Sequence, residues 1–148
     1  PHLLNHPVVD FGYRIECNGK SVFFTGDHEP SYNIYDPGDE GYDEYQSFVN
    51  ERSQGILDAV RSVDVLIADS SYTDAEYNAK KGWGHGTFST SMALAREAGV
   101  KVLFCTHHEP TRSDDALELA FQEALQSNSP WAQTMDIRLA REGDCYEF

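Results

Sequence analysis

Short apolar runs alternate with segments of helical periodicity along this chain of 148 residues. Residues 13–17 and 21–25 are strand-like runs joined by Asn18-Gly19. This dipeptide is typical of a β-hairpin with a type I′ turn, because both of its residues tolerate positive φ. Residues 29–44 are rich in Tyr, Asp, Gly and Pro and lack a period, which predicts a long surface loop.

Helical segments and buried strands alternate after this loop. The apolar spacing predicts a helix over residues 45–61 with a buried stripe of Phe48, Ile56, Leu57 and Val60. A short helical turn is predicted over 76–81, and two capped helices over 90–98 and 114–126, with Ser89 and Ser113 as their N-caps. Residues 63–68 and 100–105 read as buried strands, and residues 137–140 and 145–148 as a terminal hairpin.

This order of elements predicts an α/β chain with a mixed sheet and helices packed mainly on one face. The length fits one domain, residues 1–148, with a sizeable core. No apolar run approaches the roughly 18 residues of a membrane span, and no signal peptide is visible. The chain begins with Pro1 and lacks an initiator Met, which fits a piece of a longer protein and equally a processed chain.

Charge and cysteine content narrow the function classes. The net charge is −14, from 25 acidic and 11 basic residues, and such a field repels nucleic-acid backbones and anionic membranes. Cys17, Cys105 and Cys145 are odd in number and widely spaced, which disfavours a disulfide scaffold or a CxxC zinc site. Reduced thiols in a cytoplasmic protein fit best.

Chemically active side chains follow the predicted strands. Asp27 comes after Phe23–Gly26, Asp69 ends the next strand, and His107 follows the one after that. A carboxylate can bridge two divalent cations, and imidazole is a common zinc ligand. Because the strand would turn His108 to the opposite side, only one histidine of the pair should face the site.

His85 lies between glycines in Gly84-His85-Gly86, ahead of a predicted helix. Asp69 is placed to orient this imidazole through one ring nitrogen, which would make His85 a good proton donor to a leaving group. His6 and His28 are weaker candidates for site residues. Each of these residues alone also fits a structural role, as a turn aspartate or a half-buried histidine.

Five segments, in this order and with this spacing, resemble the motifs of the C-terminal half of metallo-β-lactamase-fold hydrolases, in the branch of the tRNA 3′-processing endonucleases and related phosphodiesterases. The segments are Gly12–Glu16, Thr25–Asp27, Val65–Asp69, Gly84–Thr87 and Phe104–Pro110. The resemblance implies half of an αββα sandwich. It also implies that Asp27 and His107 are metal ligands and that Asp69 and His85 form the proton-delivering pair.

The chain departs from this pattern in its missing HxHxDH signature, which belongs to the N-terminal half of such hydrolases. The acid of the pair is Asp69 where Glu is usual, and Gly86 stands where Ser is common. Only two of about seven expected ligand positions are present. The chain alone should therefore bind metal weakly and be inactive.

In the intact protein, the resemblance implies two divalent metals, zinc or alternatively manganese or iron, that activate a water for attack on a phosphorus or carbonyl centre. The acidic surface favours a small phosphodiester or a cyclic nucleotide over a large RNA. It also makes nucleic acid an unexpected partner for this chain alone. The missing half, or a second copy of the chain, should cover the sheet face that half a sandwich exposes.

Two other interpretations stay open from the sequence. One is a non-catalytic interaction or regulatory domain of the same fold. The other is a metal-free acidic α/β binding module in which every histidine is structural. A response-regulator-like fold is disfavoured by the Asn18-Gly19 hairpin, since that fold has parallel strands throughout.

Overall fold

A computed structural model describes residues 1–147 and contains a six-stranded mixed sheet whose strands lie side by side in chain order. The strands are β1 (His2–Leu3), β2 (Phe11–Cys17), β3 (Lys20–Phe24), β4 (Val65–Asp69), β5 (Val102–Thr106) and β6 (Asp136–Leu139). The first three strands pair antiparallel, whereas β3 to β6 pair in parallel. The predicted α/β class with a mixed sheet is confirmed.

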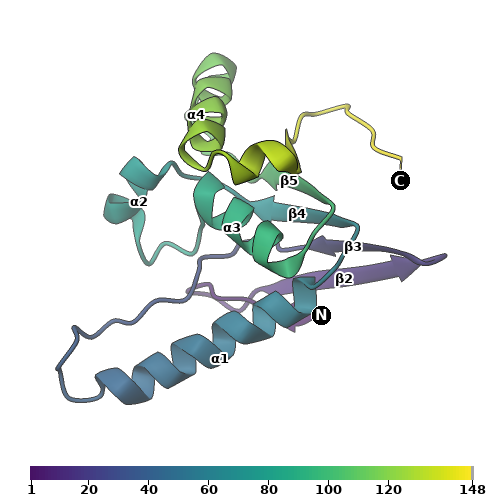
Figure 1. Cartoon of the computed structure of the whole chain (residues 1–148). Coiled ribbons are helices and arrows are strands. Elements are labelled where there is room, and N and C mark those ends of the chain that lie inside the picture. The colour runs from purple at the N-terminus through teal and green to yellow at the C-terminus, as the bar shows by residue number, and fades with distance from the viewer. Residues whose placement is uncertain (148) are drawn as a thin grey trace.

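The helices form one layer over this sheet. They are α1 (Tyr42–Val60), α2 (Asp74–Lys80), α3 (Phe88–Ala98), α4 (Asp114–Ser127) and the 3₁₀ turn η1 (Trp131–Thr134). Figure 1 shows α1, α3 and α4 on the same face of the sheet, with α2 beyond that layer on the left. Within residues 1–147, no helix combines the length and apolar character needed to cross a membrane.

Alternation along the strands separates a buried face from an open one. Phe23, Leu66 and Leu103 are paired neighbours across β3, β4 and β5, and each is fully buried against the helices. One residue further along, Phe24 is 42% exposed on the opposite face. Tyr13, its neighbour on β2, is 49% exposed. The core therefore lies between the sheet and the helix layer.

The N-terminal hairpin forms as predicted. Tyr13 pairs with Phe24 and Cys17 with Lys20, and the turn residues Asn18 and Gly19 have φ values of 51° and 75°. Positive φ at both positions is what a type I′ turn requires. The hairpin thus sets the antiparallel edge of the sheet and leads β3 toward Asp27.

Helix starts differ from the prediction. Helix α1 begins at Tyr42, three residues early, and Phe48 lies 48% exposed outside its buried stripe. Helix α3 begins at Phe88 with Thr87 as its N-cap, because Thr87 Oγ1 accepts a hydrogen bond from the Thr90 N–H at 3.1 Å in a capping box. Ser89 instead donates to the Asp74 carboxylate at 2.6 Å.

The predicted terminal hairpin is wrong. Strand β6 pairs in parallel with β5, and residues 145–147 belong to no strand, while Phe148 lies outside the described residues. The ring of Tyr146 instead packs on the open sheet face, 5.5 Å from the Phe104 ring and 4.5 Å from the Arg138 guanidinium. Packing of this aromatic side chain replaces main-chain pairing.

Candidate metal centre and proton-donating pair

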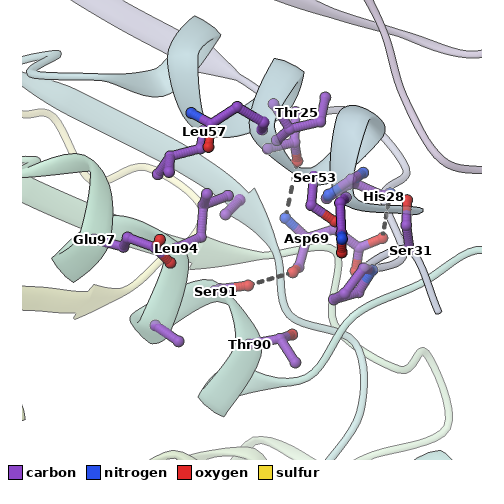
Figure 2. A pocket seen from close by; sticks show the side chains of 16 residues that line it. Thr25, His28, Ser31, Ser53, Leu57, Asp69, Thr90, Ser91, Leu94 and Glu97 are labelled. Atoms are coloured by element: carbon purple, nitrogen blue, oxygen red, sulfur yellow. Dashed lines mark hydrogen bonds between the residues drawn. The ribbon is translucent and has the colours of Figure 1, made fainter. Parts of the chain in front are cut away.

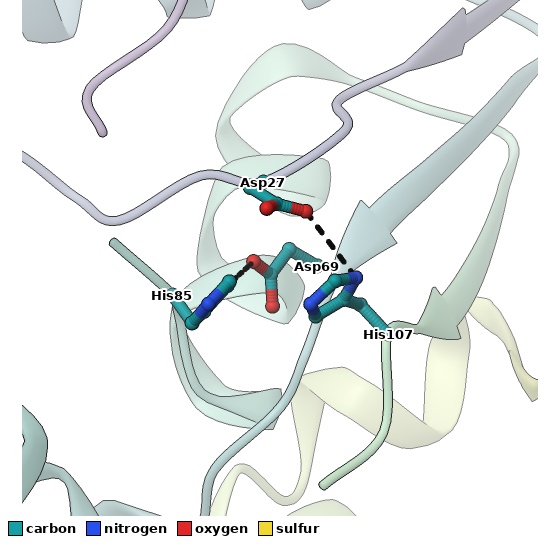
Figure 3. A group of neighbouring side chains, drawn as sticks. All are labelled: Asp27, Asp69, His85 and His107. Carbon is teal, nitrogen blue, oxygen red and sulfur yellow. Dashed lines mark hydrogen bonds and ion pairs between the residues drawn. The ribbon is translucent and has the colours of Figure 1, made fainter. Parts of the chain in front are cut away.

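Four side chains converge at the carboxyl ends of the parallel strands. Asp27 follows β3, Asp69 ends β4, His107 follows β5, and His85 comes from the loop between α2 and α3. One ligand atom from each residue lies within 4.8 Å of those of the others, and Figure 3 shows the four side chains facing one another. The structure thus brings together all four predicted site residues.

Asp27 and His107 face each other across the centre of this cluster. Asp27 Oδ1 lies 3.3 Å from His107 Nδ1. The Asp27 N–H donates to Asp10 Oδ2 at 2.8 Å, which fixes the backbone that carries the carboxylate. Gly26 has φ of 62°, and a Cβ there would lie 2.8 Å from the same Asp10 oxygen, so glycine permits this close approach.

The backbone of His107 is strained, as is common at functional sites. His107 has φ of 57°, in the left-handed region that costs a non-glycine residue about 1 kcal/mol or more. The Ser71 hydroxyl lies within hydrogen-bonding distance of the His107 carbonyl and, at 2.8 Å, of Asp69 Oδ1. Ser71 thereby links the ends of β4 and β5 on either side of the cluster.

Asp69 and His85 form a buried acid–imidazole pair. His85 Nδ1 lies 2.8 Å from Asp69 Oδ2, and the Asp69 side chain has no exposed surface. Burial raises the pKa of the Asp69 carboxyl above its usual range, and hydrogen bonds from His28, His85 and Ser71 counteract part of this rise. These contacts fix the carboxylate and so orient the His85 ring.

The glycine loop that carries His85 is held by a residue that sequence reasoning missed. Glu29 is only 2% exposed, and its carboxylate accepts hydrogen bonds from the Gly82 N–H at 2.8 Å, the Gly84 N–H at 3.0 Å and the Tyr77 hydroxyl at 2.7 Å. No strand or helix period marks Glu29. The nearest signal is its place two residues after Asp27.

His6 lies closer to the centre than its sequence context indicated. Its Nε2 is 3.8 Å from Asp27 Oδ2, and its ring centroid is 5.7 Å from that of His85. Gly84 makes room for it, since a Cβ at that position would lie 2.0 Å from His6 Cδ2. His6 lies three residues after the two-residue strand β1, which has no apolar run that the sequence pattern could detect.

Two further histidines point away from the centre. His28 is partly buried, its Nδ1 accepts from the Asn5 N–H at 3.4 Å, and desolvation lowers its pKa to about 4, which favours the neutral ring. His108 turns to the other side of the chain from His107, as alternation predicted, with Nε2 3.3 Å from the Ala140 carbonyl. Both have structural surroundings.

A cavity of about 490 Å³ lies between α1 and α3 on the helix side of Asp69. Figure 2 shows Asp69 at its wall, where the Asp69 N–H donates to Thr25 Oγ1 at 3.0 Å and the Ser91 hydroxyl donates to the Asp69 carbonyl at 2.6 Å. The cavity contains neither Asp27 nor His107 in its lining. We therefore place the chemistry at the four-residue cluster.

The donors of this cluster fit a divalent metal. Carboxylate and imidazole together suit zinc, manganese and iron. Among the described residues, the Asp27 carboxylate oxygens face only the imidazoles of His107 and His6, so no backbone N–H occupies their lone pairs. Asp69 is different because its oxygens already accept several hydrogen bonds. Asp27 and His107 are thus the better ligand candidates in this chain.

A solved structure with a similar backbone decides the fold. The metallo-β-lactamase fold protein YhfI from Bacillus subtilis superposes over 98% of this chain and 47% of its own, with a TM-score of 0.66 and 21% identity. This chain therefore has part of the metallo-β-lactamase fold. The resemblance seen in the sequence is confirmed at this level.

No family model matches the chain, but the curated relatives that it resembles share one name. A ribonuclease Z from Brevibacillus brevis is 28% identical over 102 residues, which is 69% of this chain and 29% of the relative. A ribonuclease Z from Staphylococcus aureus is 25% identical over 153 residues, or 85% of this chain and 50% of the relative. The chain thus spans half or less of the length of these relatives.

Proposed function

We propose that this chain supplies half of a metal-dependent phosphodiesterase with the metallo-β-lactamase fold. The observation that carries the proposal is the meeting of Asp27, Asp69, His85 and His107 at one edge of the sheet. The relatives named ribonuclease Z support phosphodiester hydrolysis as the reaction, because a ribonuclease cleaves phosphodiester bonds. On this proposal, residues 1–148 would be one part of a larger hydrolase domain.

Asp27 and His107 would hold metal in this site. A pair of bound divalent metals, zinc or alternatively manganese or iron, supplies Lewis acidity and an activated water for hydrolysis. Gly26 and Asp10 fix Asp27, and the strained His107 backbone aims its ring at Asp27. Two ligands are too few for a tight binuclear site, so we expect the remaining ligands from outside this chain.

His85 would protonate the leaving oxygen. Because Nδ1 of its ring faces Asp69, Nε2 is the nitrogen left to hold or release a proton at the site. Asp69 acts through His85: it fixes the ring and stabilises the charged imidazolium. Asp69 is therefore a positioning residue and His85 the proposed catalytic acid.

The open sheet face supports the proposal of a missing half. Tyr13, Phe24, Ile67 and Phe104 form one row across this face, and Tyr13 and Phe24 are about half exposed. Exposed apolar side chains in one patch indicate a covered surface in the complete assembly. The rest of the fold, or a second copy of the chain, would cover it. Without that cover we expect the chain to be inactive.

The substrate would be a small phosphodiester. The net charge of −14 opposes a large anionic RNA, which would need a basic surface from another part of the protein. We therefore expect nucleic acid to bind poorly to this chain alone.

Metal content tests the proposal directly. Elemental analysis after desalting should find two metals per chain in a form extended N-terminally to its natural start, and almost none in residues 1–148. The extended form should hydrolyse bis(p-nitrophenyl) phosphate. Asp27→Ala and His107→Ala should lose metal, whereas Asp144→Asn, in an exposed turn, should retain it. A metal-free extended form would contradict the proposal and favour a non-catalytic domain of the same fold.

A further inference from the structure

A short segment at the end of α2 presents two cations and an exposed indole beside His85. Helix α2 ends at Lys80, and Lys81-Gly82-Trp83 leads from it toward His85. Trp83 is 58% exposed, which is unusual for so large an apolar side chain. The Lys80 ammonium lies 4.1 Å from the centroid of the Trp83 ring.

These lysines are the cations that the acidic surface leaves unneutralised near the site. Six other cations pair with carboxylates, namely Arg14, Arg61, Lys101, Arg112, Arg138 and Arg141. Among the described residues, Lys80 and Lys81 form no ion pair, and each faces aromatic rings instead. Lys81 lies 4.0 Å from the Tyr32 ring centroid. Ammonium groups without an acidic partner remain available to a phosphate.

Tyr72 connects this segment with the proposed catalytic acid. Its ring centroid is 5.7 Å from the Lys80 ammonium and 6.0 Å from the His85 ring, which it meets edge-on. Trp83 is two residues from His85 in the same loop. The segment therefore borders the loop that carries the proposed catalytic acid.

The loop is held in place before any ligand binds. The buried Glu29 carboxylate accepts hydrogen bonds from the Gly82 and Gly84 N–H groups, on both sides of Trp83. Gly82 and Gly84 have φ of 88° and 98°, conformations that glycine adopts freely. A preorganised binding element loses less conformational entropy on binding than a flexible one.

We propose that Lys80, Lys81 and Trp83 form a nucleotide subsite, in which an aromatic base stacks on the exposed indole and a phosphate meets the ammonium groups. The inference rests on the proposed function and assigns recognition of the base and the phosphate of its substrate to these three residues. Stacking on aromatic side chains tolerates every base, because each base has a π-face. Glu76, Glu109 and Asp69 also act on the Tyr72 ring, so the two ammonium groups offer phosphate a partner within acidic surroundings.

Binding measured in EDTA tests this subsite without depending on metal. In a Trp131→Phe background, Trp83 is the one remaining tryptophan. Adenosine 5′-monophosphate should quench its fluorescence and bind about tenfold more tightly than ribose 5-phosphate, which lacks the base. By calorimetry, Trp83→Ala should abolish that preference and leave ribose 5-phosphate affinity unchanged. Lys80→Ala with Lys81→Ala should weaken both ligands and reduce the salt dependence of binding.

Lys20→Ala, in the distant β2–β3 hairpin, is the matched control and should change neither affinity. Equal affinities for the nucleotide and ribose 5-phosphate, or an unchanged preference in Trp83→Ala, would overturn the subsite, as would no measurable binding of either. Because the assay excludes metal, failure of metal binding or hydrolysis counts against the proposed function and not against this result.

Discussion

The Glu29 carboxylate accepts a hydrogen bond from the Gly84 N–H at 3.0 Å, one residue before His85. Glu29 itself lies two residues after Asp27, so a single short segment carries one proposed metal ligand and the anchor of the proposed catalytic acid. Since the Gly82 N–H and the Tyr77 hydroxyl donate to the same carboxylate, the anchor is fully hydrogen-bonded although it is buried. The relative position of Asp27 and His85 is therefore set largely by Glu29.

Replacing Glu29 with Gln tests this anchor. A carboxylate accepts at both oxygens, whereas an amide NH₂ would face a backbone N–H and leave a buried donor unpaired. We expect Glu29→Gln to lower the free energy of unfolding by about 1–3 kcal/mol in urea denaturation. Glu51→Gln, an exposed glutamate of α1, should stay within about 0.5 kcal/mol. If both variants changed the free energy of unfolding equally, Glu29 would not anchor the glycine loop.

Gly84 offers a second test, because its lack of a side chain makes room for His6. In Gly84→Ala the new Cβ would lie 2.0 Å from His6 Cδ2 and 2.7 Å from Pro7 Cδ. Gly38 is a matched control, with φ of 102° against 98° and nothing within 4 Å of the corresponding Cβ. In both variants, the positive φ of the new alanine lowers stability by about 1 kcal/mol. Thermal denaturation should show a larger loss for Gly84→Ala, and equal losses would mean that His6 moves freely.

The sequence predicted the meeting of the four candidate side chains better than it predicted the termini of the elements. Asp27, Asp69 and His107 each follow an apolar run, and parallel pairing of β3, β4 and β5 brings such positions to one edge. Glu29 and His6 lie in loops, where no periodicity marks burial. Their positions depend on long-range hydrogen bonds and close packing that local pattern does not encode.

The C-terminal segment shows that a local pattern can also predict a strand that does not form. Residues 137–140 and 145–148 alternate like strands, and the turn at Gly143 forms with φ of 84°. Pairing of β6 is nevertheless with β5, and the Tyr146 ring packs on Phe104. Local propensity could not weigh that tertiary contact against a second hairpin strand.

The three cysteines should differ in their reactivity toward thiol reagents. Cys17 and Cys145 are exposed, whereas Cys105 is fully buried on β5, and burial raises its thiol pKa to about 12. The thiolate is the reactive form, so Cys105 should be inert in the folded chain. Titration with an aromatic disulfide reagent at pH 8 should give two fast thiols, and the third only in denaturant. Three fast thiols in native buffer would show that β5 opens readily.

Asp64 should make a pH-dependent contribution to stability. The Lys101 ammonium, 2.6 Å from Oδ1, and the Ser21 N–H, 2.8 Å from Oδ2, lower the pKa of Asp64 to about 2. Since the folded pKa lies below that of the unfolded chain, the unfolded state takes up the proton first as pH falls. The stabilisation is therefore complete above the ordinary carboxyl pKa and is lost as pH falls toward 2.

Urea denaturation across pH 6 to 2 tests this contribution. The gap in free energy of unfolding between the wild type and Asp64→Asn should stay constant above about pH 5 and close below pH 4. In a Lys101→Met background, the gap should be smaller and should close at a higher pH, because the main cause of the shift is gone. A gap that persists unchanged to pH 2 would show that Asp64 acts through packing and not through its charge.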